Sequence, residues 1–276
     1  MNRISPHGRW NGKLTSRDLP VVDETIDALS KTERTELARH WLSRGASERR
    51  VGDAFLFVRD ALRAGRAPES LVTLATRAVD DEMRHAEISR IVASRFAGRE
   101  LPAPALLPLI TPKHPGVNPE MRLTLWMLGQ CAFNETYASA VLEASLAETT
   151  GPLANAALRE LLSDEVDHAK LGWAFFATQS RAEQKAVEPW LLPLARVNLK
   201  MWRETPRDYP SDAKLVRQGA LSLELLETAL IEALKSLVVP GFREFGIDTS
   251  AIERWISTGA PTQDNERTSE AMQTPT

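Results

Sequence analysis

A run of closely spaced prolines constrains this 276-residue chain more than any other feature. Six of them fall between Gly98 and Pro119. Proline inside a helix removes a backbone hydrogen bond and clashes with the preceding turn, so this segment cannot form a regular helix. On both sides of it, apolar residues recur at helical spacing. The sequence therefore predicts two helical halves joined by a long connection, which contains Pro102, Pro104, Pro108, Pro112, Pro115 and Pro119.

Four long segments carry this periodicity, and together they predict an all-α fold. The expected helices run over about 32–63, 68–98, 120–149 and 152–178, with Pro68 in a first helical turn. Short connections make the first two helices antiparallel neighbours, and likewise the last two. Two helical hairpins joined by one long crossover are the pattern of a ferritin-like four-helix bundle.

The remainder of the chain predicts additional C-terminal helices packed on the bundle. They are expected over about 182–202 and 214–238, with a short one near 249–257. Residues 1–258 should form a single ferritin-like domain, with the bundle core at about 32–178 and the C-terminal helices at about 182–257. Residues 259–276 hold almost no large apolar side chain, which predicts a disordered tail.

Composition excludes several classes of function. A net charge of −3 and a pI near 6.0 give no basic surface of the kind that nucleic acids or anionic membranes attract. The single cysteine, Cys131, excludes a disulfide within the chain and agrees with a reducing compartment. The sequence shows neither a signal-peptide pattern nor an apolar run of roughly 18 residues. We therefore expect a cytoplasmic protein that binds neither nucleic acid nor membrane.

The pattern Asp-Glu-x-x-His-Ala occurs twice, at 81–86 and at 164–169, within the second and fourth predicted helices. A Glu and a His three residues apart lie on one helix face about one turn apart, where they can share a metal ion. A single copy is usually a solvated surface pair, but both copies here lie on mainly apolar faces. Burying ionisable groups without a partner is costly, so two such pairs in one fold predict a metal site formed by Glu82, His85, Glu165 and His168.

A centre for two metals needs one further glutamate from each of the other two helices. Glu135 lies on the apolar stripe of the third helix, at nearly the same distance from the turn as Glu165. In the first helix, Glu48 faces the apolar stripe, whereas Asp53 faces away but matches the height of Glu82 better. Facing favours Glu48, and Asp53 remains the alternative. The predicted metal ligands are Glu48, Glu82, His85, Glu135, Glu165 and His168.

The order Glu, Glu-x-x-His, Glu, Glu-x-x-His, with about thirty residues between partners, resembles the ferritin-like di-iron carboxylate superfamily over roughly 32–178. The segment 48–82 most resembles a group of bacterial ferritin-like domain proteins. The resemblance implies two iron ions, with manganese as the alternative, that react with dioxygen or peroxide. It also implies that Asp81 and Asp164 each accept a hydrogen bond from the histidine of the opposite motif. Leu161 stands where p-aminobenzoate N-oxygenases carry an additional histidine.

The function favoured by these residues and this resemblance is a non-haem di-iron oxidoreductase that hydroxylates, N-oxygenates or desaturates a small organic substrate. The sequence has no dinucleotide fingerprint and no cysteine cluster, so a separate reductase or the substrate itself must supply electrons. An iron-handling ferroxidase, a di-manganese catalase-like protein and a non-enzymatic helical scaffold with a vestigial site are the alternatives. A stored tyrosyl radical is disfavoured because Tyr137 points about 200° away from Glu135. The sequence leaves a homodimer open.

The remaining histidines and the cysteine predict no further ligands. His7, His40 and His114 have no partner at ligand spacing and are expected at the surface. Cys131 lies one turn before Glu135, where a buried packing role is favoured over a place beside a substrate cavity.

Overall fold

The computed structural model of the protein describes residues 18–204, 209–210 and 212–258. Within these residues every regular element is a helix, which confirms the all-α prediction. The predicted disordered tail, 259–276, lies outside the described residues. None of the described helices is both long enough and apolar enough to cross a membrane.

The first helical half contains the short α1 (Glu24–Asp27) and two long helices, α2 (Lys31–Ala64) and α3 (Glu69–Ala97). Ser30 and Glu33 form a reciprocal capping box at the start of α2. Pro68 is the N-cap of α3 rather than a residue of its first turn, because its backbone is extended with ψ at 136°. Both long helices otherwise match their predicted ranges closely.

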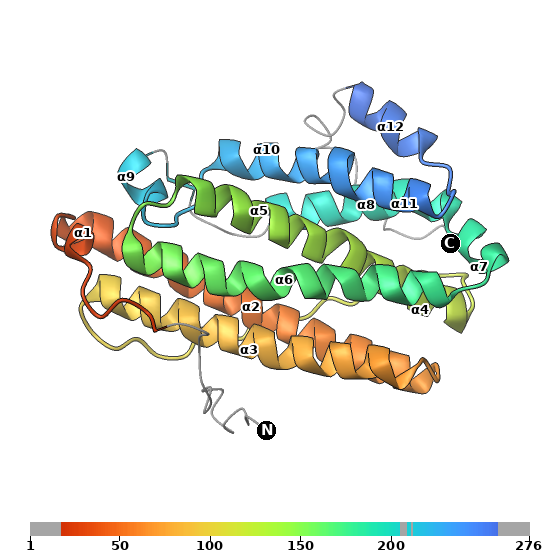
Figure 1. The fold of residues 1–276 in the computed structure, drawn as a ribbon, viewed down its shortest axis with the longest axis horizontal. Coiled ribbons are helices and arrows are strands. Elements are labelled where there is room, and N and C mark those ends of the chain that lie inside the picture. The colour runs from red at the N-terminus through yellow and green to blue at the C-terminus, as the bar shows by residue number, and fades with distance from the viewer. Residues whose placement is uncertain (1–17, 205–208, 211, 259–276) are drawn as a thin grey trace.

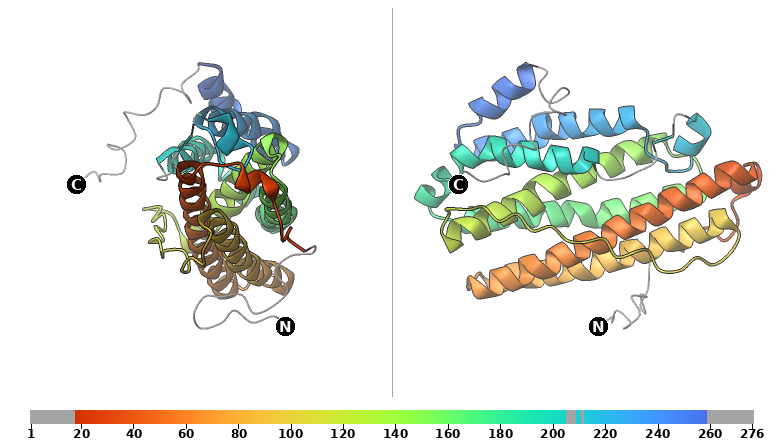
Figure 2. Two further views of the ribbon diagram at one scale, coloured as in Figure 1. Left: turned by 90° about the vertical axis from the view of Figure 1, so that its left-hand side faces the viewer. Right: turned by 180° about the vertical axis from the view of Figure 1, so that it is seen from behind.

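The second half contains α4 (Pro119–Met127), the π-helical segment η1 (Leu128–Asn134), α5 (Glu135–Glu148) and α6 (Pro152–Thr178). The predicted α-helix 120–149 is thus continuous but changes to π-helical pitch in its middle. No helix forms between α3 and α4, as the prolines require. Viewed from behind, this connection runs along most of the length of α2 (Figure 2).

The C-terminal part contains α7 (Arg181–Lys185), α8 (Glu188–Glu204), α9 (Ala213–Val216), α10 (Leu223–Ala233), η2 (Leu234–Val238), α11 (Val239–Glu244) and α12 (Ser250–Ser257). Both longer helices predicted here were wrong as single elements. The first divides between α7 and α8. The second divides at Gly219, whose φ of 84° lies in the left-handed region that ends a helix, and Ser222 then caps α10.

The long helices lie side by side: α2 with α3, α5 with α6, and α10 with α5 (Figure 1). Buried apolar residues form three clusters. One joins α5 to α8, α10 and α11, around Phe133 and Phe242. The other two lie among α2, α3 and α6 toward opposite ends of these helices, one around Trp41 and Phe96, the other around Phe55. The predicted metal ligands lie between these last two clusters along the chain, in the middle of the long helices.

The burial of these apolar clusters offsets the free-energy cost of burying the predicted metal ligands, which form a polar layer between them. Each fully buried leucine or phenylalanine contributes roughly 1.5–3 kcal/mol relative to an exposed one. Trp41, Phe55 and Phe96 are at most 1% exposed. The packing on both sides of the layer can therefore hold ionisable side chains away from water.

Candidate metal centre

Six side chains from four helical segments converge in the interior. Glu48 comes from α2, Glu82 and His85 from α3, Glu135 from the first position of α5, and Glu165 and His168 from α6. They form two overlapping groups, in each of which the candidate ligand atoms lie within 4.8 Å of one another. One group is Glu48, Glu82, His85 and Glu165, and the other is Glu82, Glu135, Glu165 and His168. The structure thus brings together all six residues predicted from the sequence.

Glu82 and Glu165 belong to both groups, and the contacts of the histidines show how. The Nδ1 atom of His168 lies 3.1 Å from Oε1 of Glu82 and 3.4 Å from Oε2 of Glu165. The Nδ1 atom of His85 lies 3.4 Å from Oε1 of Glu165 and 3.7 Å from Oε2 of Glu82. Each imidazole therefore faces both shared carboxylates through the same ring nitrogen.

Burial and missing hydrogen bonds indicate that these atoms suit a metal ion. Glu82 and His85 are completely buried, and Glu135, Glu165 and His168 are at most 3% exposed. Both oxygens of Glu82, Oε2 of Glu165 and Nδ1 of both histidines have no partner in hydrogen-bonding geometry. Buried polar atoms are normally satisfied, and a set of carboxylate oxygens and imidazole nitrogens fits iron, manganese or zinc. These buried groups could hold a metal ion.

The protonation states reflect four carboxylates packed together. Burial, together with the neighbouring charges of Glu82 and Glu165, raises the pKa of Glu48 to about 8. Burial and the same two neighbours raise the pKa of Glu135 well above its usual range. Burial lowers the pKa of His85, but the contacts with Glu165 and Glu82 outweigh it and bring the value to about 9. A divalent cation would replace these protons as the positive charge in the centre.

The outer nitrogen of each imidazole faces an aspartate of the opposite motif. Nε2 of His85 lies 3.1 Å from Oδ2 of Asp164, and because an ionised carboxylate only accepts, the ring donates there and leaves Nδ1 free to bind a cation. Nε2 of His168 lies 3.6 Å from Oδ2 of Asp81, which is longer than a hydrogen bond. The expected hydrogen bond from the histidine of the opposite motif is thus present at Asp164, whereas at Asp81 the histidine faces the carboxylate without forming one.

Arginines from α3 compensate the charge of these aspartates. Arg84 donates to Asp164 and lies 3.8 Å from Asp81 and 3.7 Å from Glu160. Arg77 lies 3.5 Å from Asp81. The carboxylates on the outer side of the histidines are therefore paired by protein cations, separately from the inner glutamates.

Glu135 is held by polar residues that the sequence analysis did not identify. Gln130 and Asn134, both in η1, donate through their amide nitrogens to Oε1 of Glu135, the latter at 3.0 Å. The indole nitrogen of Trp202, in α8, donates in turn to Oδ1 of Asn134 at 2.9 Å. The π-helical pitch of η1 sets this geometry, and apolar periodicity carries no signal for it.

The structure brings Glu48 into the centre, and Asp53 is in neither group. Gly52 lies at the contact between α2 and α3, where a Cβ atom would be 2.6 Å from Cε of Met83 and 3.4 Å from Cβ of Glu82. The absence of a side chain lets α2 approach α3 closely beside the ligands. Gly52, a residue type that weakens helices, thus occupies a close helix contact.

The glutamates border a cavity of about 70 Å³, where a single water needs roughly 10–15 Å³. Its walls come from α2, η1, α5 and α8, and include the basic residues His40, Arg44 and Arg50. The prediction that His40 lies at the surface was wrong, because His40 is only 7% exposed. The four-residue spacing of His40, Arg44 and Glu48 was a readable signal that all three share a face.

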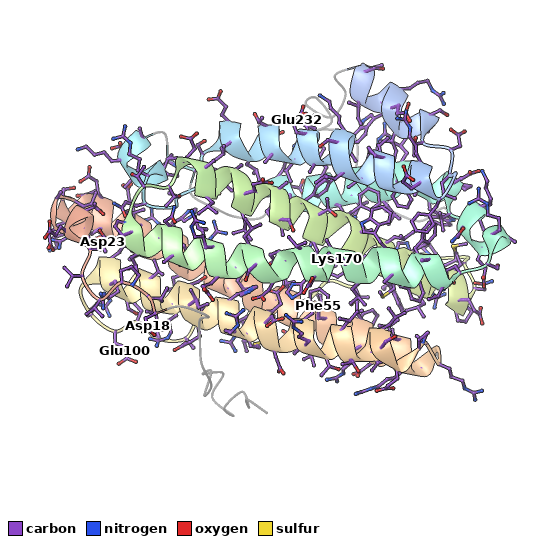
Figure 3. All side chains as sticks on the ribbon, viewed as in Figure 1. Asp18, Asp23, Phe55, Glu100, Lys170 and Glu232 are labelled. Atoms are coloured by element: carbon purple, nitrogen blue, oxygen red, sulfur yellow. The ribbon has the colours of Figure 1, made fainter. Side chains whose placement is uncertain are left out.

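The cysteine and the other histidines of the described residues belong to neither ligand group. Cys131 is fully buried in the apolar cluster around Phe55, in keeping with a packing role. Phe55, marked in Figure 3, also packs on the His168 ring, with centroids 5.1 Å apart. His114 lies half-buried beside Trp190 rather than at the surface, and His7 lies outside the described residues.

Comparison with protein-family models and with curated proteins finds no match for this chain.

Proposed function

We propose that this protein is a ferritin-like, non-haem di-iron oxidoreductase that uses dioxygen to oxidise a small organic substrate by hydroxylation, N-oxygenation or desaturation. The observation that carries the proposal is the pair of interlocked ligand groups sharing Glu82 and Glu165. Two groups with two common carboxylates match a pair of adjacent ions held by four glutamates and two histidines. Two iron ions at this position would supply the redox chemistry and the site at which dioxygen is activated.

The residues of the chain have different roles in this proposal. Glu82 and Glu165 would contact both ions, Glu48 and His85 one of them, and Glu135 and His168 the other. Asp164 and Asp81 act as positioning residues, because each faces the outer nitrogen of one imidazole. The apolar clusters on either side keep bulk water from the centre.

A cavity beside the ligands favours an organic substrate over an iron store. The apolar part of its wall includes Val141, Leu142 and Leu221, which suit a carbon skeleton better than a hydrated ion. When one oxygen atom of dioxygen enters a substrate, the other is reduced to water with electrons and protons from a donor. An external reductase or electron donor is therefore part of the proposal.

Metal analysis and oxygen uptake test this function together. Protein loaded anaerobically with ferrous iron should hold two ions per chain and should consume dioxygen rapidly on mixing, with a change in the visible absorbance. Glu135→Gln should slow that consumption, because it removes a ligand without removing the cavity. At most one ion per folded chain would refute the two-metal centre. Two ions with equally slow oxygen uptake in wild type and Glu135→Gln would leave a metal-binding helical scaffold as the better account.

A further inference from the structure

The cavity contains positive charge that metal binding does not use. Arg44 lies one turn before Glu48 on α2 and lines the cavity, and its Cζ atom stands 5.4 Å from the centre of the Trp41 ring. The Nε atom of Arg44 is buried and has no hydrogen-bond partner. Arg50 lines the same cavity, and its Nη2 atom lies 3.5 Å from Oγ of Ser47. A cavity-lining arginine whose Nε donor is buried and unused marks a place for an acceptor.

Two metal ions in the centre would neutralise the glutamates and leave these arginines without a counter-charge. The acidic residues that line the cavity are the four candidate ligands Glu48, Glu82, Glu135 and Glu165, with no further acid among the described residues of its wall. Two divalent cations would neutralise these four carboxylates. An arginine cannot release its proton under ordinary conditions, and a buried unpaired charge is costly. An anion near Arg44 would restore the balance of charge in the loaded protein.

The apolar part of the wall limits what kind of anion this is. Ala138, Val141, Leu142 and Leu221 border the same space, together with Trp202. An inorganic ion would leave these surfaces against water, whereas an organic acid would cover them with its carbon skeleton. The planar fork of a guanidinium matches a carboxylate through two parallel hydrogen bonds.

We propose that the cavity binds a small organic carboxylate, with its carboxylate group on Arg44 and its apolar body against the α5 side of the wall. Arg50 adds a second positive charge to the cavity wall. This inference names the substrate class of the centre and rests on the proposed function. The reacting carbon or nitrogen would be on the apolar body of the acid.

Calorimetric titration of the zinc-loaded protein tests the inference, because zinc fills the ligand set without redox chemistry. The probes are benzoate and hexanoate, each paired with its neutral amide, benzamide and hexanamide. Both acids should bind at least tenfold more tightly than their amides. Arg44→Gln should weaken binding of the acids roughly tenfold or more, the usual effect of losing a charged hydrogen bond, and should leave the amides unchanged. Arg49→Gln is the matched control, because Arg49 donates to the Pro104 carbonyl outside the cavity wall.

The controls separate direct metal binding of the acid from recognition by Arg44. Zinc content is measured in every variant. Equal affinity of wild type and Arg44→Gln for both acids at equal zinc content would overturn the inference, since the metals alone would then hold the carboxylate. Amides that bind as tightly as acids would also overturn it. If Arg44→Gln does not fold, Arg44→Lys retains the charge but lacks the fork, and unchanged acid binding in that variant refutes the role of Arg44. A chain that holds two ions and consumes oxygen but rejects both acids loses this inference alone, whereas a chain that holds fewer ions loses the proposed function.

Discussion

Replacing individual glutamates with glutamine should distinguish the ligands that bridge two ions from those that bind only one. Glu82 and Glu165 belong to both ligand groups, whereas Glu48 and Glu135 each belong to one. A glutamine keeps the size of the side chain but cannot bridge two cations as an anion. We expect Glu82→Gln and Glu165→Gln to reduce metal content from two ions per chain to none. Glu48→Gln and Glu135→Gln should each retain one ion.

The melting temperature should show the same difference between bridging and terminal ligands, by an amount that can be calculated. At a free metal concentration 100-fold above the dissociation constant, each bound ion stabilises the folded chain by about 2.7 kcal/mol. For a chain of this size, each kcal/mol raises the melting temperature by roughly 2 °C. Metal should therefore raise the melting temperature by about 11 °C in wild type, about 5 °C in the terminal variants and not at all in the bridging variants.

The assay compares each variant with itself, with and without manganese or zinc, by differential scanning calorimetry and elemental analysis. This comparison removes the effect that the substitution itself has on the stability of the metal-free protein. Such an effect is expected, because burial already disfavours the charge of Glu48 and Glu135. Retention of a full ion and half of the thermal shift by Glu82→Gln would refute the bridging assignment. Loss of both ions in Glu48→Gln would show that the two positions do not fill separately.

Three further outcomes follow from the same geometry. The pKa of Glu48 is raised to about 8 and that of His85 to about 9, so both groups bind a proton on folding. Their contribution to the free energy of unfolding is present at low pH and is lost as pH rises through these values. The melting temperature of the metal-free protein should therefore fall between about pH 5 and pH 9, while the increase in melting temperature caused by metal grows. A flat profile without metal in circular dichroism melts would contradict this. Gly172→Ala should destabilise the protein by about 1–3 kcal/mol in urea unfolding, because its Cβ would lie 2.6 Å from the Ala132 nitrogen, whereas Gly129→Ala, whose nearest neighbour is 3.6 Å away, should be neutral or stabilising. Equal stability of the two variants would refute a close contact between α6 and η1. Asp53→Ala should keep both ions by elemental analysis, and loss of metal there with retention in Glu48→Gln would reverse the first-helix assignment.

Helix positions and the repeated motif could be read from the sequence because both depend on local spacing. An apolar face repeating every three or four residues identified α2, α3 and α6 nearly to the residue, and the prolines excluded helix between α3 and α4. The same periodicity placed Glu82 with His85 and Glu165 with His168 on interior faces. It could not show the left-handed Gly219 that divides the predicted helix 214–238, because a glycine is tolerated within a helix and only its surroundings select the conformation.

The sequence alone determined which side chains are candidates for the centre, and only the tertiary structure decided which of them meet. Facing favoured Glu48 and helix height favoured Asp53, and the packing of α2 on α3 brings Glu48 to the other ligands. The amides that hold Glu135 depend on the π-helical pitch of η1, and the place of Arg44 in the cavity wall depends on α5 and α8 packing beside α2. Spacing along one helix is fixed by local hydrogen bonds, whereas the distance and height of one helix relative to another follow from the summed packing of side chains far apart in the chain.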